Sequence, residues 1–134
     1  MENGKSHILI VDDDALTCML LSDILTHAGF KTTTITNGLD ALAFIRNDPN
    51  TIDVIILDRI MPELTGIEVL HKLCAIPIAR NIPVIMLTSR AESSHVETAF
   101  MLGVFEFLYK PINETALVQA VNDAMTEKSS HIYE

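Results

Sequence analysis

Five polar side chains follow short apolar, β-branched segments of this sequence, and together they could perform phosphoryl transfer. They are Asp12, Asp13, Asp58, Thr88 and Lys110. A carboxylate such as Asp58 can act as a nucleophile and form an acyl phosphate. A hydroxyl and a fixed ammonium group are suited to bind the oxygens of the transferred group. Alone, Thr88 would be an ordinary cap or turn residue, and Lys110 a solvated charge.

Short apolar segments alternate with segments of helical periodicity five times along the chain. Strands are expected at 7–11, 30–35, 52–57, 82–87 and 104–109. Helices are expected at 15–28, 38–47, 66–75, 93–102 and 114–127. This alternation predicts an α/β fold, a doubly wound five-stranded parallel sheet with helices on both faces. In the strand order 2-1-3-4-5, strands one and three are neighbours, so Asp12, Asp13 and Asp58 would share one cleft.

Three neighbouring carboxylates raise one another's pKa values unless a cation lies between them. Ligands that are all oxygen, without His or Cys, suit a hard ion such as Mg²⁺. The alternative is that the run from Asp12 to Asp14 only caps the first helix, where acidic residues are favoured. We assign that capping role to Asp14, which stands next to the helix start.

Helix ends have their own signals. Asn37 and Asn113 stand where N-caps are expected, and Gly29 and Gly103 where helices should stop.

Composition limits the possible functions. The chain has 134 residues, 49% of them hydrophobic, which fits one globular domain, and its net charge of −9 argues against direct nucleic-acid binding. Cys18 and Cys74 are far apart, as in a reducing cytosol. No apolar run reaches the ~18 residues of a membrane span, and residues 1–6 lack a signal-peptide core, so we expect a cytoplasmic protein without membrane contact. The histidines have no metal-ligand spacing and are expected on the surface or its rim.

The sequence resembles the receiver domains of two-component response regulators from His7 to about Glu127. The resemblance depends on four motifs, Val11-Asp12-Asp13, Leu57-Asp58-Arg59-Ile60-Met61-Pro62 with Gly66, Ile82-Pro83-Val84-Ile85-Met86-Leu87-Thr88, and Lys110-Pro111. It implies a flavodoxin-like fold, with residues 1–6 as a polar tail and 128–134 as a polar tail or the start of a linker. The sequence does not separate a stand-alone regulator from a receiver cut from a longer protein.

The resemblance implies that Asp58 accepts a phosphoryl group from a histidine kinase or phosphotransfer protein. Asp13 and Asp58 would bind Mg²⁺ directly, together with the backbone carbonyl of Ile60, and Asp12 would act mainly through water. Thr88 and Lys110 would hold phosphoryl oxygens.

The resemblance also implies a cis peptide bond between Lys110 and Pro111, and a conformational switch. On phosphorylation Thr88 would move toward the phosphoryl group, and Phe107 would fill the vacated space. The family more often has tyrosine at the position of Phe107, so this side chain could instead be core in both states. The partner would be a downstream protein or an output domain.

The sequence departs from the family at further positions, two of which bear on the lifetime of the phosphoaspartate. Ser89 stands where alanine is commoner and should fit. Ile60 and Arg90 occupy positions that tune the loss of the phosphoryl group to water in this family. An apolar Ile60 should hinder the attacking water, so we expect a long-lived phosphoaspartate.

Cys18, Met19 and Phe105 stand at positions where this family often has charged residues. Exposed apolar side chains often mark docking surfaces, so we assign these three to a partner surface. The alternative is that they pack locally.

Two functions of other classes compete with a receiver. A phosphatase working through an aspartyl phosphate would need a second acid two residues after its nucleophile, where Ile60 stands. A constitutive interaction module would have lost acids or the lysine, which are all present. We therefore expect no enzymatic activity beyond the domain's own phosphorylation and dephosphorylation.

Overall fold

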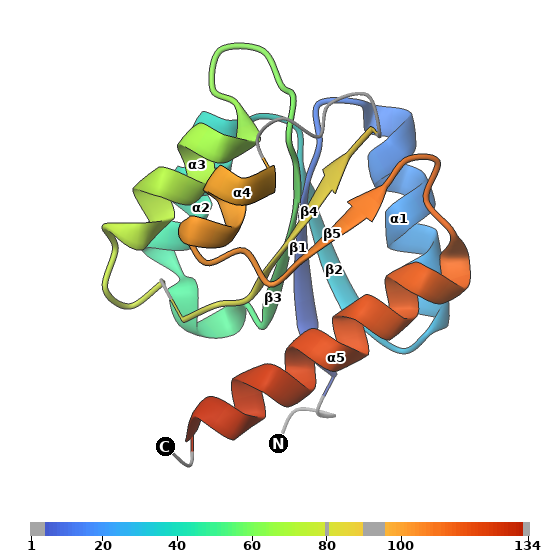
Figure 1. Cartoon of the computed structure of the whole chain (residues 1–134). Coiled ribbons are helices and arrows are strands. Elements are labelled where there is room, and N and C mark those ends of the chain that lie inside the picture. Colours follow the sequence, from blue (N-terminus) through green and yellow to red (C-terminus); the bar gives the residue numbers. More distant parts are fainter. Residues whose placement is uncertain (1–4, 80, 90–95, 133–134) are drawn as a thin grey trace.

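The chain folds into one parallel sheet covered by helices on both faces (Figure 1), as predicted. This computed structural model describes residues 5–79, 81–89 and 96–132. The strand order is β2-β1-β3-β4-β5. The strands are β1 (His7–Val11), β2 (Lys31–Ile35), β3 (Val54–Asp58), β4 (Val84–Thr88) and β5 (Glu106–Tyr109). The helices are α1 (Ala15–His27), α2 (Gly38–Asn47), α3 (Gly66–Cys74), α4 (Val96–Met101) and α5 (Glu114–Ile132), with a 3-10 turn η1 at Pro49–Thr51.

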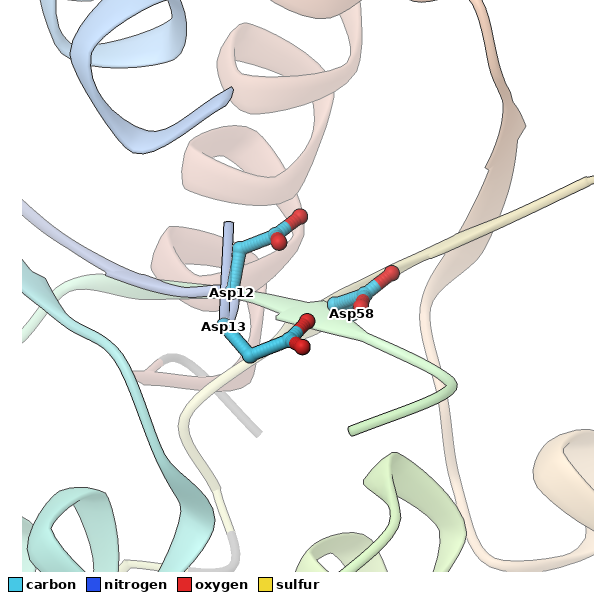
Figure 2. A group of neighbouring side chains, drawn as sticks. All are labelled: Asp12, Asp13 and Asp58. Carbon is cyan, nitrogen blue, oxygen red and sulfur yellow. The ribbon is translucent and has the colours of Figure 1, made fainter. Parts of the chain in front are cut away.

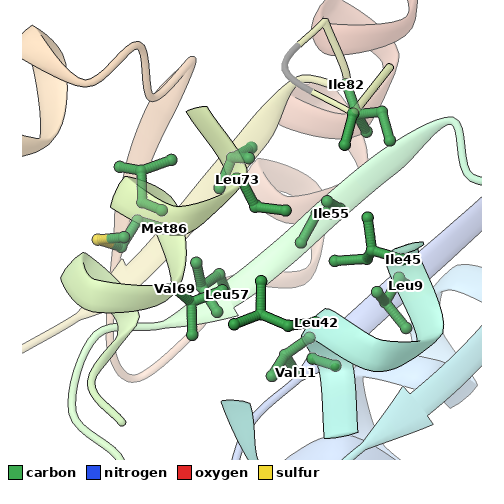
Figure 3. Close-up of a cluster of buried hydrophobic side chains, with 14 of the residues drawn as sticks. Leu9, Val11, Leu42, Ile45, Ile55, Leu57, Val69, Leu73, Ile82 and Met86 are labelled. Atoms are coloured by element: carbon green, nitrogen blue, oxygen red, sulfur yellow. The ribbon is translucent and has the colours of Figure 1, made fainter. Parts of the chain in front are cut away.

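The core has two layers, because successive side chains of a strand point to opposite faces of the sheet. One cluster lies beneath α2, α3 and α4 and includes Leu9, Leu57 and Met86 (Figure 3). The other lies beneath α1 and α5 and includes Ile8 and Ile56. Every residue of β1, β3 and β4 is buried, as expected for strands in the middle of a parallel sheet.

The predicted helix caps are confirmed. Side-chain oxygens of Asp14, Asn37 and Asn113 each accept a hydrogen bond from a backbone N–H in the first turn, at 3.2, 2.8 and 2.8 Å. Gly29 and Gly103 follow α1 and α4 with φ of 98° and 93°, a left-handed conformation that favours glycine.

Element boundaries differ from the prediction at several points. β4 and β5 each begin two residues later than expected. Pro83 lies just before β4, and its carbonyl accepts a hydrogen bond from the Ile55 N–H. α5 continues to Ile132, so residues 128–132, expected in a polar tail, are helical. The expected start of α4 at residue 93 lies outside the described residues.

Only some of the apolar residues that recur at helical spacing in α1 are buried. The helix buries Cys18, Leu21 and Leu25, whereas Leu16 and Leu20 are 58% and 55% exposed. These two leucines lie on the opposite side of the helix from the buried three.

The expectation that Cys18 faces a partner is wrong. Its thiol donates a hydrogen bond to the Asp12 carbonyl at 3.2 Å. Burial, reinforced by the nearby Asp12 charge, raises the pKa of the Cys18 thiol to about 11, so it stays protonated as this donor. Neither Cys18 nor Cys74 is in a disulfide.

The expectation that every histidine lies on the surface or its rim is wrong for His7, which is buried in β1. Its Nδ1 lies 2.8 Å from the Thr51 carbonyl and its Nε2 lies 2.7 Å from the Thr33 hydroxyl. These partners come from other elements and satisfy both ring nitrogens. His27 and His71 are exposed, whereas His95 and the side chain of His131 lie outside the described part of the chain. Among the described helices, none combines the length and apolar character needed to span a bilayer.

Candidate functional site

The carboxyl ends of the central strands converge on a pocket of about 250 Å³. This is the edge of the sheet where open α/β folds bind ligands. All five polar residues selected from the sequence line it. The complete lining is Asp12, Asp13, Asp14, Asp58, Arg59, Ile60, Thr88, Ser89 and Lys110.

Three carboxylates form the acidic side of this pocket (Figure 2). Oxygens of Asp12, Asp13 and Asp58 all lie within 4.8 Å of one another. Asp12 is fully buried, and its two oxygens accept hydrogen bonds from the Asp14 N–H at 2.9 Å and from Lys110 Nζ at 3.3 Å. Asp13 is exposed and Asp58 is buried. The trio therefore presents oxygen ligands from both sides of the β1–β3 junction.

Lys110 is a cation that contacts two of these carboxylates. Its backbone N–H donates to the Thr88 carbonyl at 2.8 Å, which fixes it beside the end of β4. Its Nζ lies 2.9 Å from Asp58 Oδ1 and 3.3 Å from Asp12 Oδ2. Burial lowers the pKa of Lys110, but the hydrogen bond and charge of Asp58, with Asp12, outweigh burial and raise it overall. The peptide bond to Pro111 is cis, as predicted.

The Asp58 carboxyl has an unusually high pKa. Burial, together with the charges of Asp12 and Asp13, raises this pKa from its ordinary 3.8 to about 6, although the hydrogen bond and charge of Lys110 lower it. Lys110 contacts Asp12 and Asp58 but carries one positive charge against the three carboxylates of the trio. A set of oxygen ligands with uncompensated negative charge fits a hard divalent cation.

Thr88 is buried at the end of β4 and is hydrogen-bonded to Arg59, which is not among the five residues selected from the sequence. Its hydroxyl accepts a hydrogen bond from Arg59 Nε at 3.3 Å and donates to the Ser89 carbonyl at 3.3 Å. Arg59 is only 6% exposed. A long cationic side chain directly after Asp58 was the available signal, but its direction depends on packing against β4.

Gly66 determines how closely α3 approaches this end of β3. A Cβ atom at Gly66 would lie 2.3 Å from the Asp58 carbonyl oxygen and 2.8 Å from Arg59 Cα. The Gly66 N–H donates to the Arg59 carbonyl at 2.8 Å. Only glycine permits this approach, which fixes the backbone on which Asp58 and Arg59 stand.

The remaining predicted residues surround the pocket. Ile60 lies at its rim with 53% of its surface exposed. Phe107 is partly buried against the core cluster and contacts the Phe100 ring edge to face, with centroids 5.4 Å apart. Arg90 lies outside the described residues.

The predicted partner surface is only partly exposed. Met19 is 55% exposed, next to the exposed Leu16 and Leu20, so α1 carries an apolar surface at its amino-terminal half. Phe105 is partly buried and packs against the core beneath α1 and α5. It does not stand out into solvent as Met19 does.

Sequence comparison identifies relatives of this chain. The family model for the response regulator receiver domain matches residues 8–122. The Oryza sativa protein "Two-component response regulator ORR5" is 34% identical over 109 residues, covering 81% of each chain. The Escherichia coli protein "Transcriptional regulatory protein GlrR" is 31% identical and covers 96% of this chain, but the match spans only 28% of that protein.

Solved structures agree with these relatives. A response regulator receiver domain protein from Clostridium thermocellum superposes with a TM-score of 0.87 at 29% identity, covering 92% of this chain and 97% of that one. The chemotaxis protein CheY4 of Vibrio cholerae superposes with a TM-score of 0.83 at 27% identity, covering 90% and 99%. Because the family model covers residues 8–122 and the fold superposes on these structures, the chain belongs to the response regulator receiver domain family.

Proposed function

We propose that Asp58 accepts a phosphoryl group from a phosphohistidine on a histidine kinase or phosphotransfer protein. The observation that carries this proposal is the 2.9 Å contact between Lys110 Nζ and Asp58 Oδ1 inside the acidic pocket. A pKa of about 6 leaves Asp58 mostly ionised at neutral pH, as a nucleophile must be. Lys110 then lies where it can bind an oxygen of the incoming group.

The transfer is an in-line displacement. An Asp58 oxygen forms a bond to phosphorus as the bond from phosphorus to the histidine nitrogen breaks, and that nitrogen keeps the electron pair. Lys110 and the Thr88 hydroxyl stabilise the charge on the equatorial oxygens.

The site fits Mg²⁺ because its donors are all oxygen and carry excess negative charge. Asp13, Asp58 and the Ile60 carbonyl would hold the ion directly, and Asp12 through water. When bound, Mg²⁺ would neutralise charge on the phosphoryl oxygens. Both Asp12 oxygens already accept hydrogen bonds, which supports its indirect role.

The signal would pass from Thr88 to Phe107. Thr88 turns toward the phosphoryl group, and Phe107 moves into the space it leaves. Phe107 contacts Phe100 on α4, where Phe100 and Met101 are 51% and 85% exposed. A rearrangement of Phe107 would therefore change a surface that a downstream partner can recognise.

The partner would be either a separate protein or an output domain. The matched relatives include a two-component response regulator of similar length and a much longer transcriptional regulatory protein. We assign the domain no reaction beyond its own phosphorylation and dephosphorylation, because Ile60 stands where a phosphatase would place a general acid.

Intact-mass spectrometry tests the proposal. We expect incubation with phosphoramidate and Mg²⁺ to add one phosphoryl group to the wild-type protein. The Asp58→Asn variant, or wild type with EDTA in place of Mg²⁺, should remain unmodified. Equal modification of Asp58→Asn would overturn the assignment of Asp58.

A further inference from the structure

We propose that Arg59 is a positioning residue that holds Thr88 in its resting orientation and so opposes the phosphorylated state. This inference rests on the proposed role of Thr88 in binding a phosphoryl oxygen. It makes the residue directly after the acceptor aspartate a determinant of how readily the domain switches.

The backbone of Arg59 is fixed from two sides. Its N–H donates to the Leu87 carbonyl of β4 at 2.9 Å, and its carbonyl accepts from the Gly66 N–H at 2.8 Å. At Gly66 the two backbone segments approach so closely that an added Cβ atom would lie 2.8 Å from Arg59 Cα. The Arg59 side chain therefore extends from a backbone that is hydrogen-bonded on both sides, beside the end of β4.

The side chain reaches Thr88 in a buried environment. Arg59 is 6% exposed and Thr88 is 3% exposed, and Arg59 Nε donates to Thr88 Oγ1 at 3.3 Å. A hydroxyl has one proton, and Thr88 donates it to the Ser89 carbonyl at 3.3 Å. Both hydrogen bonds point the hydroxyl at groups other than the carboxylates and the lysine.

Switching must break this arrangement. To bind a phosphoryl oxygen, Thr88 has to redirect its proton from Ser89 and move Oγ1, so the Arg59 Nε–H loses its acceptor. A buried donor that loses its partner opposes the change. Arg59 makes at least one further interaction, so the inference concerns this one N–H and not the whole guanidinium group.

Two substitutions of Arg59 separate the effect of its hydrogen bond from the effects of its side-chain volume and charge. Arg59→Met keeps a chain of similar length but has no donor. Arg59→Gln can place an amide N–H at the position of Nε while also removing the charge. Arg59→Gln should therefore restore the hydrogen bond to Thr88 that Arg59→Met removes.

The first measurement is the affinity for beryllofluoride, used with Mg²⁺ as a phosphoryl mimic and followed by NMR. We expect Arg59→Met to bind about three- to tenfold more tightly than wild type, the size of one hydrogen bond. Arg59→Gln should stay within about twofold of wild type. Unchanged or weaker binding by Arg59→Met, or a glutamine variant that matches methionine, would overturn the inference.

The second measurement needs no phosphoryl chemistry. Three-bond couplings to the Thr88 methyl report its χ1 populations in the unphosphorylated protein. Wild type and Arg59→Gln should show one dominant rotamer, and Arg59→Met an average over several. A single rotamer in Arg59→Met would contradict the inference. If wild type accepts neither phosphoryl group nor mimic, the proposed function fails, while these couplings still decide whether Arg59 holds Thr88.

Discussion

At the scale of single residues, the site is held in an unfavourable charge state. The carboxylates of Asp12, Asp13 and Asp58 lie within 4.8 Å of one another, and burial raises the pKa of Asp58 to about 6. The fold thus stabilises a protonated Asp58, whereas the proposed chemistry needs the ionised form. A cation or a phosphoryl group would relieve this conflict.

Asp58→Asn should therefore stabilise the metal-free protein at neutral pH. The pKa of Asp58 is raised from 3.8 to about 6 in the folded protein. The stabilising contribution of its protonated carboxyl is therefore fully present below pH 3.8 and is lost as pH rises through 6. At ~1.4 kcal/mol per pKa unit, the loss is on the order of 3 kcal/mol. Lys110 loses its negatively charged partner at position 58 in the variant, so we expect a gain of about 1–3 kcal/mol.

Urea unfolding in EDTA at pH 7.5 and pH 4.5 measures this effect. The advantage of Asp58→Asn should shrink at the lower pH, where the wild-type carboxyl takes up its proton. A variant less stable than wild type at pH 7.5 would mean that the ion pair with Lys110 outweighs the burial of Asp58.

Some residues could be identified from the sequence and others could not. The five polar residues of the pocket were identifiable because each follows a buried strand, and parallel strands align their carboxyl ends. Arg59 was not, because its contact with Thr88 spans 29 positions and depends on packing. His7 was misplaced for the same reason, since its ring contacts Thr33 and Thr51 from other elements.

At the scale of elements, short sequence patterns predicted the strands and the helix caps. They did not predict which side of a helix faces solvent. Asp14, Asn37 and Asn113 act through neighbours three residues away or fewer, which sequence reveals directly. In α1, apolar residues occur on both sides of the helix. Only docking on the sheet decides that Cys18 is buried and Leu20 is not.

Truncations in α1 test which face is buried. Leu25→Ala should cost about 2–5 kcal/mol of unfolding free energy, because Leu25 is fully buried. Leu20→Ala, at 55% exposure, is the matched control and should cost less than about 0.5 kcal/mol. Chemical denaturation gives both values, and comparable losses would refute this orientation of the helix.

The junction of β3 and α3 should not tolerate a side chain at position 66. Gly66→Ala places a methyl group 2.3 Å from the Asp58 carbonyl oxygen, and we expect it to cost about 2–4 kcal/mol. Gly29→Ala is a useful comparison, because position 29 has positive φ but open space around it. It should cost about 1 kcal/mol through backbone strain alone. Equal losses in the two variants would show that the close approach is not tight.

At the scale of the whole molecule, the pocket and the exposed apolar surface of α1 lie near the same end of the sheet. Leu16, Met19 and Leu20 follow directly from the acidic loop after β1. A phosphohistidine protein that reaches Asp58 would therefore contact this surface. The net charge of −9 does not prevent such docking, because the surface itself is apolar.

Met19→Glu should slow transfer from a phosphohistidine donor protein by about tenfold or more, because it places a charge in an apolar interface. Phosphorylation by phosphoramidate should remain unchanged, since the pocket does not include Met19. Ile78→Glu is the control, an equally exposed apolar residue in the loop between α3 and β4 at the other end of the sheet. Equal slowing by both variants would argue against a docking role for α1.

The central claim is that one carboxylate, that of Asp58, carries the phosphoryl group. Borohydride reduces an aspartyl phosphate to homoserine, so reduction followed by peptide sequencing reads the position directly. We predict homoserine at position 58 alone after treatment with phosphoramidate and Mg²⁺. Homoserine at position 12 or 13, or an unmodified position 58 in protein that has gained a phosphoryl group, would contradict the account.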